Sequence, residues 1–186
     1  MQEELVFSGF GGQGVMFAGQ LLAYTAMDEG FEVTWIPSYG PEMRGGTAHC
    51  YVVIADRPIG SPLVRNPKVA VVFNKPSFDK YEPLVAAGGL LVTNSSLVEQ
   101  ASRRDDILEL RVPATEIADE VGSLKLANLV LLGAVLQARP ILSLDALARG
   151  LENHIPSHRR DMLEMNITAM QRGAHFAAEL MAVEAK

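Results

Sequence analysis

Two short segments of this chain combine residue types that could bind a ligand. The first is the glycine-rich run 9–14 (GFGGQG), which has the spacing G-x-G-x-x-G. It follows the apolar run 5–7 and precedes helix-forming residues from Val15 onward. Glycines at such a junction allow a tight turn and a close approach of the backbone, and the helix start offers free N–H groups to an anion. The run therefore predicts a ligand- or partner-facing site at Gly11, Gly12, Gln13 and Gly14.

The same spacing occurs in dinucleotide-binding folds, but a second feature of those folds is missing here. They place an acidic residue at the end of the second strand, where it bonds the ribose hydroxyls. In this chain the second apolar run ends at Ser38, and Glu32 lies at its beginning. The loop also lacks the Gly-Lys-Ser/Thr of a triphosphate-binding loop. Three interpretations stay open: a dinucleotide or flavin, another anion, or glycines that only permit tight packing.

The second segment is the loop 38–47 (SYGPEMRGGT), in which glycines and prolines surround a phenol, a carboxylate and a guanidinium. It follows the second predicted strand, at the end where open parallel sheets bind ligands. Glu42 and Arg44 could form a surface ion pair of little weight, or Arg44 could make a bidentate contact with a carboxylate or phosphate. We favour the second interpretation, because so constrained a loop is costly for a plain connection. The predicted ligand- or partner-facing residues are Tyr39, Glu42, Arg44, Gly45 and Gly46.

The elements that must position these loops alternate between strand and helix. This alternation predicts an α/β fold with a Rossmann-like, mostly parallel sheet flanked by helices. From Pro113 onward the pattern is helical, and Ser143 is placed to cap one of these helices. We expect a single domain over residues 1–186. The predicted strands are 5–7, 31–36, 47–55, 69–73, 89–93 and 107–112, and the predicted helices are 15–27, 76–85, 114–121, 126–138, 144–153 and 158–181.

Composition and charge exclude several classes of protein. The formal net charge is −6 and the few paired arginines are followed by aspartates, so we expect no nucleic-acid partner. One cysteine, Cys50, excludes a four-thiolate metal or iron–sulfur site within the chain, and its strand position predicts a buried, unreactive thiol. His154 and His158 lack a third ligand nearby, so we expect no metal site. Without a signal sequence or a membrane-length apolar run, the chain is predicted to be cytoplasmic.

Two further patterns concern the helices. Asn128 is polar within the apolar run 126–138, so it either bonds to backbone or points toward the functional edge. The last helix has an apolar face and an opposite polar stripe at Glu164, Thr168, Gln171, His175 and Glu179. Helix 15–27 is apolar on most sides, and the last helix carries several methionines. Because such faces can remain uncovered in a partner-dependent protein, we expect the isolated chain to form homo-oligomers.

The two loops, and the order of the segments after them, resemble the γ subunit of the 2-oxoacid:ferredoxin oxidoreductases. After GFGGQG and SYGPEMRGGTA, that order continues with HCYVVIADRPIGSPLV, VAVVFNKPSFDKY, LKLANLVLLGAVL and EMNITAMQRGAHFA. The resemblance therefore covers nearly the whole chain. The second loop is closer to those of the 2-oxoglutarate and branched-chain types than to that of the indolepyruvate type.

The resemblance implies a multi-subunit oxidoreductase that decarboxylates a 2-oxoacid, here 2-oxoglutarate, forms an acyl-coenzyme A and reduces ferredoxin. Thiamine diphosphate, its Mg²⁺ and the iron–sulfur clusters would be held by α-, β- and δ-type partner subunits. This chain alone would bind no cofactor and be inactive, and coenzyme A would be a co-substrate of the complex. The resemblance assigns no catalytic role to an individual residue. The alternative is a stand-alone Rossmann-type protein that binds a dinucleotide or a flavin.

Overall fold

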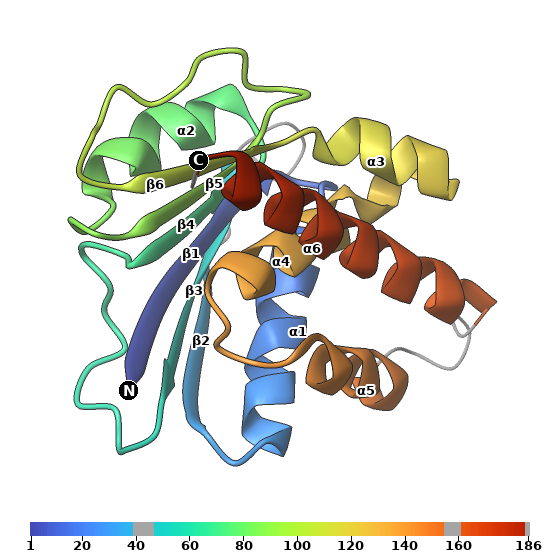
Figure 1. The fold of residues 1–186 in the computed structure, drawn as a ribbon. Coiled ribbons are helices and arrows are strands. Elements are labelled where there is room, and N and C mark those ends of the chain that lie inside the picture. The colour runs from blue at the N-terminus through green and yellow to red at the C-terminus, as the bar shows by residue number, and fades with distance from the viewer. Residues whose placement is uncertain (39–46, 155–160, 185–186) are drawn as a thin grey trace.

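The structure, a computed structural model, describes residues 1–38, 47–154 and 161–184. At its centre is a six-stranded sheet with the strand order β2-β3-β1-β4-β5-β6 (Figure 1). The sheet confirms the predicted Rossmann-like α/β fold. Its strands are β1 (Gln2–Phe10), β2 (Glu32–Ser38), β3 (Thr47–Ala55), β4 (Val69–Val72), β5 (Leu90–Asn94) and β6 (Leu108–Val112).

Strand directions show how far the sheet is parallel. β1, β4, β5 and β6 pair in parallel, whereas β3 runs antiparallel to both of its neighbours, β1 and β2. β2 therefore points the same way as β1 but is separated from it by β3. The segment 5–36 is thus a strand–loop–helix–strand unit without direct pairing of its two strands.

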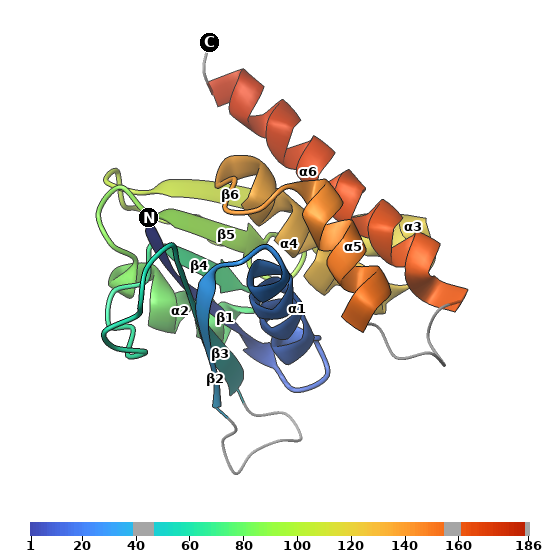
Figure 2. The same ribbon diagram turned by 90° about the horizontal axis from the view of Figure 1, so that it is seen from below.

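Helices cover the two faces of the sheet unequally (Figure 2). One face carries a group of helices in which α4 packs on α6 and α1 packs on α5. The other face carries α2, which contacts β1 and β4. The helices are α1 (Val15–Asp28), α2 (Lys75–Tyr81), α3 (Ala114–Val121), α4 (Ala127–Ala138), α5 (Leu144–His154) and α6 (Leu163–Glu184), with short 3₁₀ turns η1 (Glu82–Leu84) and η2 (Leu124–Leu126).

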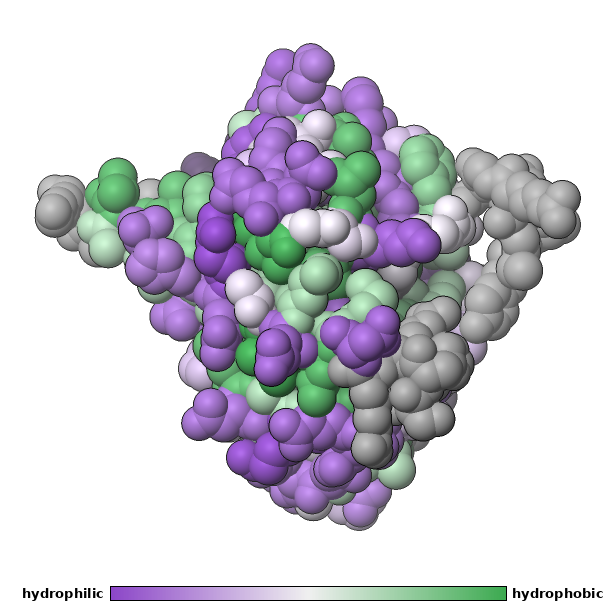
Figure 3. All heavy atoms as spheres, turned by 90° about the vertical axis from the view of Figure 1, so that its right-hand side faces the viewer, coloured by the Kyte–Doolittle hydropathy of each residue, from purple (hydrophilic) through white to green (hydrophobic). Residues whose placement is uncertain are grey.

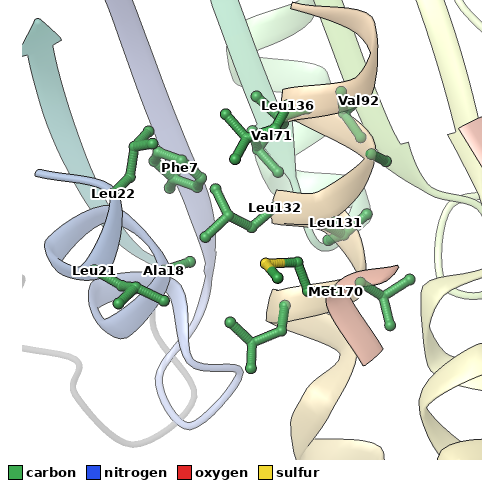
Figure 4. Packing of buried hydrophobic residues seen from close by; sticks show 14 of the residues in the cluster. Phe7, Ala18, Leu21, Leu22, Val71, Val92, Leu131, Leu132, Leu136 and Met170 are labelled. Atoms are coloured by element: carbon green, nitrogen blue, oxygen red, sulfur yellow. The ribbon is translucent and has the colours of Figure 1, made fainter. Parts of the chain in front are cut away.

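The larger hydrophobic core lies between the sheet and the group of helices (Figure 4). Leu132 and Leu136 of α4 point toward Phe7 and Val71 of the sheet. Residues 128–136 of α4 are all buried, because the sheet lies on one side of this helix and α6 on the other. This double burial explains why the sequence of α4 is apolar almost all round.

α4 and α6 cross at very close range through a pair of glycines. A Cβ atom added at Gly133 would collide with the carbonyl oxygen of Met170, and one added at Gly173 would collide with that of Val130. Only glycine lets two helix backbones approach this closely. The crossing fixes α6 against the core and thereby sets the position of its amino-terminal end.

Most element bounds lie close to the prediction from sequence, but β1 runs over Gln2–Phe10 rather than 5–7, and α2 ends at Tyr81 rather than at 85. β3 and α3 begin and end at the predicted residues, and Ser143 accepts a hydrogen bond from the Ala146 N–H at 3.0 Å, as a cap should. The predicted polar stripe of the last helix is exposed. That helix begins at Leu163 rather than near His158, and residues 155–160 lie outside the described part of the chain.

The apolar helix α1 is covered within the chain itself. Its buried side chains contact β1, β2, β3 and α5, and the apolar face of α6 packs on α4. Among the apolar residues of α1, Met27 stands out with 57% exposure. The sequence predicted self-association because such apolar faces can remain uncovered in a partner-dependent protein. Intrachain packing covers most of the apolar residues of both helices, and self-association of the isolated chain stays a prediction.

Candidate functional site at the carboxyl edge of the sheet

The glycine loop 11–14 leaves the sheet at the edge where β2 ends and β3 begins. Phe10, the last residue of β1, pairs with Thr47, the first residue of β3. Ser38, the last residue of β2, pairs with His49. The described strand ends on either side of residues 39–46 therefore lie beside the glycine loop. The predicted residues Tyr39, Glu42, Arg44, Gly45 and Gly46 are themselves outside the described residues.

The conformation of the loop depends on Gly14, which immediately precedes α1. Gly14 has φ 77° and ψ 17°, in the left-handed region that side-chain-bearing residues rarely adopt. A Cβ atom at this position would also collide with the side chain of Asn128. Gly14 is therefore required both for the turn and for the approach of α4. Gly11 and Gly12 are exposed at the edge, where a ligand or partner could reach them.

Gln13 holds the loop closed from within. Its side-chain oxygen accepts hydrogen bonds from the Phe10 N–H at 2.6 Å and from the Asn74 amide at 3.2 Å. Asn74 follows β4 and also caps α2, because its oxygen accepts a bond from the Ser77 N–H at 3.0 Å. The Gln13–Asn74 bond thus links the loop before α1 to the start of α2. Asn74 was missed from the sequence, although an asparagine directly before Lys-Pro is a recognisable helix-cap signal.

Asn128 combines the two roles that the sequence left open. It is 4% exposed, and its amide donates a hydrogen bond to the Gly14 carbonyl at 3.2 Å. It therefore bonds to backbone, and the carbonyl that accepts this bond belongs to the predicted site at the glycine loop. Through this bond the start of α4 is tied to the start of α1.

Cys50, the one cysteine of the sequence, is buried, as predicted. The Cys50 thiol is fully buried, and burial raises its pKa to about 12. Its sulfur lies 3.8 Å from the carbonyl oxygen of Val15. His49, its neighbour in β3, is half-buried, and burial together with the nearby Lys80 charge lowers its pKa. Cys50 is thus a packing residue under α1, since a thiol with so high a pKa is unreactive at neutral pH.

The strand order bears on the dinucleotide alternative. In a dinucleotide-binding sheet the second strand lies next to the first, so that its terminal acid reaches the ribose. Here β3 separates β2 from β1, and β2 ends at Ser38. The position that should carry the acid is therefore one strand further away and holds no carboxylate. The strand order therefore differs from that of a dinucleotide-binding sheet.

Two features are absent from the described residues. No group of three or more His, Cys, Asp or Glu side chains in residues 1–38, 47–154 and 161–184 could hold a metal ion. Within the same ranges, no helix is long and apolar enough to cross a membrane.

The mostly parallel sheet, with a glycine loop leading from strand β1 into α1, defines a Rossmann-like α/β protein. A family model described as pyruvate ferredoxin/flavodoxin oxidoreductase matches residues 4–176. The chain therefore belongs to this family.

Relatives in the family are of two lengths. The 2-oxoglutarate synthase subunit KorC of Methanocaldococcus jannaschii is 34% identical over 183 residues, which cover 97% of this chain and 96% of KorC. The ketoisovalerate oxidoreductase subunit VorA of Methanothermobacter marburgensis is 39% identical over 171 residues. That match covers 91% of this chain but 35% of VorA, so the chain spans about a third of that relative's length.

Solved structures agree with the fold. A keto/oxoacid ferredoxin oxidoreductase γ subunit from Geobacter sulfurreducens superposes with a TM-score of 0.82 at 28% identity, covering 95% of this chain and 99% of that one. A 2-oxoglutarate:ferredoxin oxidoreductase from Magnetococcus marinus, with 2-oxoglutarate, coenzyme A and succinyl-CoA bound, gives a TM-score of 0.87. Its identity is 20% and the match covers 31% of that chain, so this likeness concerns the fold.

Proposed function

We propose that this chain is the γ-type subunit of a multi-subunit 2-oxoacid:ferredoxin oxidoreductase and is inactive by itself. The observation that carries the proposal is the end-to-end match with KorC and with the Geobacter γ subunit, each covered at least 96% by this chain. In such a complex a 2-oxoacid is oxidatively decarboxylated to an acyl-coenzyme A while ferredoxin is reduced. Because KorC is named for 2-oxoglutarate and matches over its whole length, 2-oxoglutarate is the substrate that we propose.

The side chains of this chain indicate which cofactors must be bound by other subunits. A single cysteine cannot hold an iron–sulfur cluster, which needs about four cysteine ligands. The described residues also bring no three metal-binding side chains together that could hold the Mg²⁺ of thiamine diphosphate. We therefore assign thiamine diphosphate, Mg²⁺ and the clusters to α-, β- and δ-type partner subunits. The γ chain would contribute the edge of its sheet at the glycine loop 11–14 as a contact surface in the complex.

That edge is where we place the contact with coenzyme A or with a partner. The start of α1 directs the positive end of its dipole toward the edge, and its first turn contains no acidic residue. Arg44, in the loop between β2 and β3, would add a full positive charge there. A phosphate of coenzyme A, or an acidic segment of a partner subunit, would complement these groups.

Reconstitution tests the subunit assignment. Methyl-viologen reduction is measured with 2-oxoglutarate, thiamine diphosphate and coenzyme A, first with the pure chain and then with co-expressed partner subunits. The pure chain should show no turnover, and the assembled complex should be active. Turnover by the pure chain would contradict the proposal, as would a complex whose activity is unchanged when this chain is left out.

Arg44→Ala tests the edge itself. In the assembled complex we expect a rise of about tenfold in the coenzyme A concentration needed for half-maximal rate, as for loss of a charged hydrogen bond. Arg57→Ala is the matched control, because Arg57 is exposed in the turn after β3, at the opposite end of the sheet. Equal coenzyme A dependence in the two variants would mean that the loop 39–46 has a structural role.

A further inference from the structure

The strand β2 forms one edge of the sheet, with β3 on its inner side and α1 against one of its faces (Figure 2). All seven residues of β2 are at least partly exposed. An edge strand presents backbone N–H and C=O groups that have no partner within the sheet, and a strand of another chain can pair with them. Whether β2 fits such a strand depends on which of its backbone groups face outward.

The hydrogen bonds between β1 and β3 identify the outward-facing groups of β2. The N–H of Asp56 donates to the carbonyl of Met1 at 3.2 Å, at the pair that continues the β1–β3 register. Because bonding positions alternate along an antiparallel pair, the even-numbered residues of β3 bond to β1 and its odd-numbered residues bond to β2. Those odd-numbered residues pair with the even-numbered residues of β2. The backbone groups of Val33, Trp35 and Pro37 therefore point away from the sheet.

Two of the outward positions, Val33 and Trp35, can both donate and accept hydrogen bonds. Pro37 has no N–H, and the N–H of Phe31 is already bonded in the turn after α1. A two-fold axis through Thr34 would place Val33 of each copy opposite Trp35 of the other and form four backbone hydrogen bonds. The ladder would end on both sides at the positions that cannot donate. The edge is therefore self-complementary.

The side chains of β2 are compatible with the same two-fold axis. Thr34 would lie opposite its own copy, and Val33 opposite Trp35. Threonine pairs and pairs of an aromatic with a β-branched residue both stabilise neighbouring strands. Glu32 would lie opposite Ile36, so no two carboxylates face each other. Ile36 is 36% exposed, and the aliphatic part of Glu32 from the second copy would cover it.

Other surfaces of the described residues fit a second copy less well. The opposite edge strand, β6, carries the charged residues Glu109 and Arg111, and Arg111 donates to the carbonyls of Val98 and Glu99 at 2.8 and 3.0 Å. Charged side chains on an edge strand oppose pairing with another chain. On the helical side, polar residues surround the apolar surface (Figure 3), and helices use their backbone groups internally. The segment 33–36 (VTWI) of β2 is uncharged.

We propose that β2 is an interface at which a second copy of this chain pairs in the antiparallel direction, so that the two sheets join into one. The occupant is a second copy because the free donors and acceptors of β2 are arranged symmetrically about Thr34. They therefore match those of an identical strand that runs the opposite way. This interface places the self-association predicted from the sequence at a strand edge, away from the apolar helix faces that the chain itself packs.

Sedimentation equilibrium of the full chain tests the interface. A small interface gives a weak dimer, so the chain is measured at concentrations up to about 1 mM, where its mass should approach that of two copies. Thr34→Lys should raise the dissociation constant of the dimer about tenfold, because it places two like charges opposite each other. Thr168→Lys is the matched control. Thr168 is exposed on the polar stripe of α6, so this variant should dimerise as the wild type does.

Oxidative cross-linking tests the register of the two strands. Thr34 would form a non-hydrogen-bonded pair with its own copy, with Cα atoms about 4.5 Å apart, which a disulfide can span. Thr34→Cys should therefore give a disulfide-linked dimer under mild oxidation. Ile36→Cys should not, since this position would lie about 13 Å along the strand from its own copy. The native Cys50 is fully buried and should not react.

A monomer at every concentration would overturn the proposal, as would a dimer that Thr34→Lys weakens no more than Thr168→Lys. Equal cross-linking of Thr34→Cys and Ile36→Cys would also overturn it, because the two-fold axis would then not pass through Thr34. Circular dichroism verifies that each variant is folded. Neither partner subunits nor activity enter these measurements, so a failure of this interface is distinguishable from a failure of the subunit assignment.

Discussion

The two faces of the sheet are built differently. The face under α1 and α4 holds a core that is almost entirely apolar and is closed by a second layer of helices. The face under α2 holds a smaller cluster made of Val6, Ala70, Val72, Phe78, Tyr81, Val85, Leu91 and Val98. Beside this smaller cluster lie buried hydroxyl groups, including a Ser8–Ser77 hydrogen bond of 2.9 Å. The comparison indicates that the first face supplies most of the stability, while the second is thinner and more polar.

The largest expected effect is at the crossing of α4 and α6. Gly173→Ala should lower the free energy of unfolding by about 3 kcal/mol or more, because the new methyl group collides with the Val130 carbonyl and the helices must separate. Chemical denaturation followed by circular dichroism measures this loss. Gly60→Ala is the control, since nothing lies within 4 Å of a Cβ added there. If the two variants were equally stable, the helical layer would not be as rigidly packed as the structure shows.

Matched leucines compare the faces directly. Leu132 and Leu91 are both fully buried, the first in the larger core and the second in the smaller cluster. Leu132→Ala should cost about 3 kcal/mol and Leu91→Ala about 2 kcal/mol, because a cavity enclosed on all sides relaxes less than one under a single helix. Denaturation of both variants under identical conditions gives the difference. A larger loss for Leu91→Ala would reverse the comparison.

The sequence predicted each element of both faces but not how they are assembled. β3 and α3 were placed correctly because alternation of apolar residues and turn residues is local information. The insertion of an antiparallel β3 between β1 and β2 was missed, because strand order depends on pairing between distant segments. The glycine loop was recognised from its spacing. The hydrogen bonds that hold it, from Asn74 and Asn128, come from segments far along the chain.

A smaller loss in the free energy of unfolding is expected at Gln13, which links the start of α1 on one face of the sheet to the start of α2 on the other. Gln13→Ala removes the acceptor for the Phe10 N–H and the Asn74 amide, and should cost about 1–2 kcal/mol. Gln13→Glu keeps a side-chain oxygen at the same position and should recover most of that loss. Denaturation of the two variants separates the acceptor from the rest of the side chain. Equal losses would show that these hydrogen bonds do not hold the loop.

The smallest effect is expected at Tyr81, within the thinner face. Tyr81 is fully buried between His49 and Tyr51, with ring centroids 5.9 and 6.5 Å away, and burial raises the pKa of its phenol. Its hydroxyl lies near those of Tyr51 and Ser8 but forms no hydrogen bond of normal geometry among the described residues. Removing a buried hydroxyl that has no partner relieves its desolvation cost, so Tyr81→Phe should change the free energy of unfolding by less than about 0.5 kcal/mol, or raise it slightly.

Ser77→Ala is the matched comparison on the same face, because it removes a buried hydroxyl that is bonded, to Ser8. This variant should lose about 1 kcal/mol, since the Ser8 hydroxyl would then be buried without its partner. Thermal and chemical denaturation of both variants measure the two changes in the free energy of unfolding. If Tyr81→Phe cost as much as Ser77→Ala, the Tyr81 hydroxyl would have to be bonded in solution. The buried hydroxyl groups on the face under α2 would then all be hydrogen-bonded. The two faces would differ only in the amount of apolar surface that they bury.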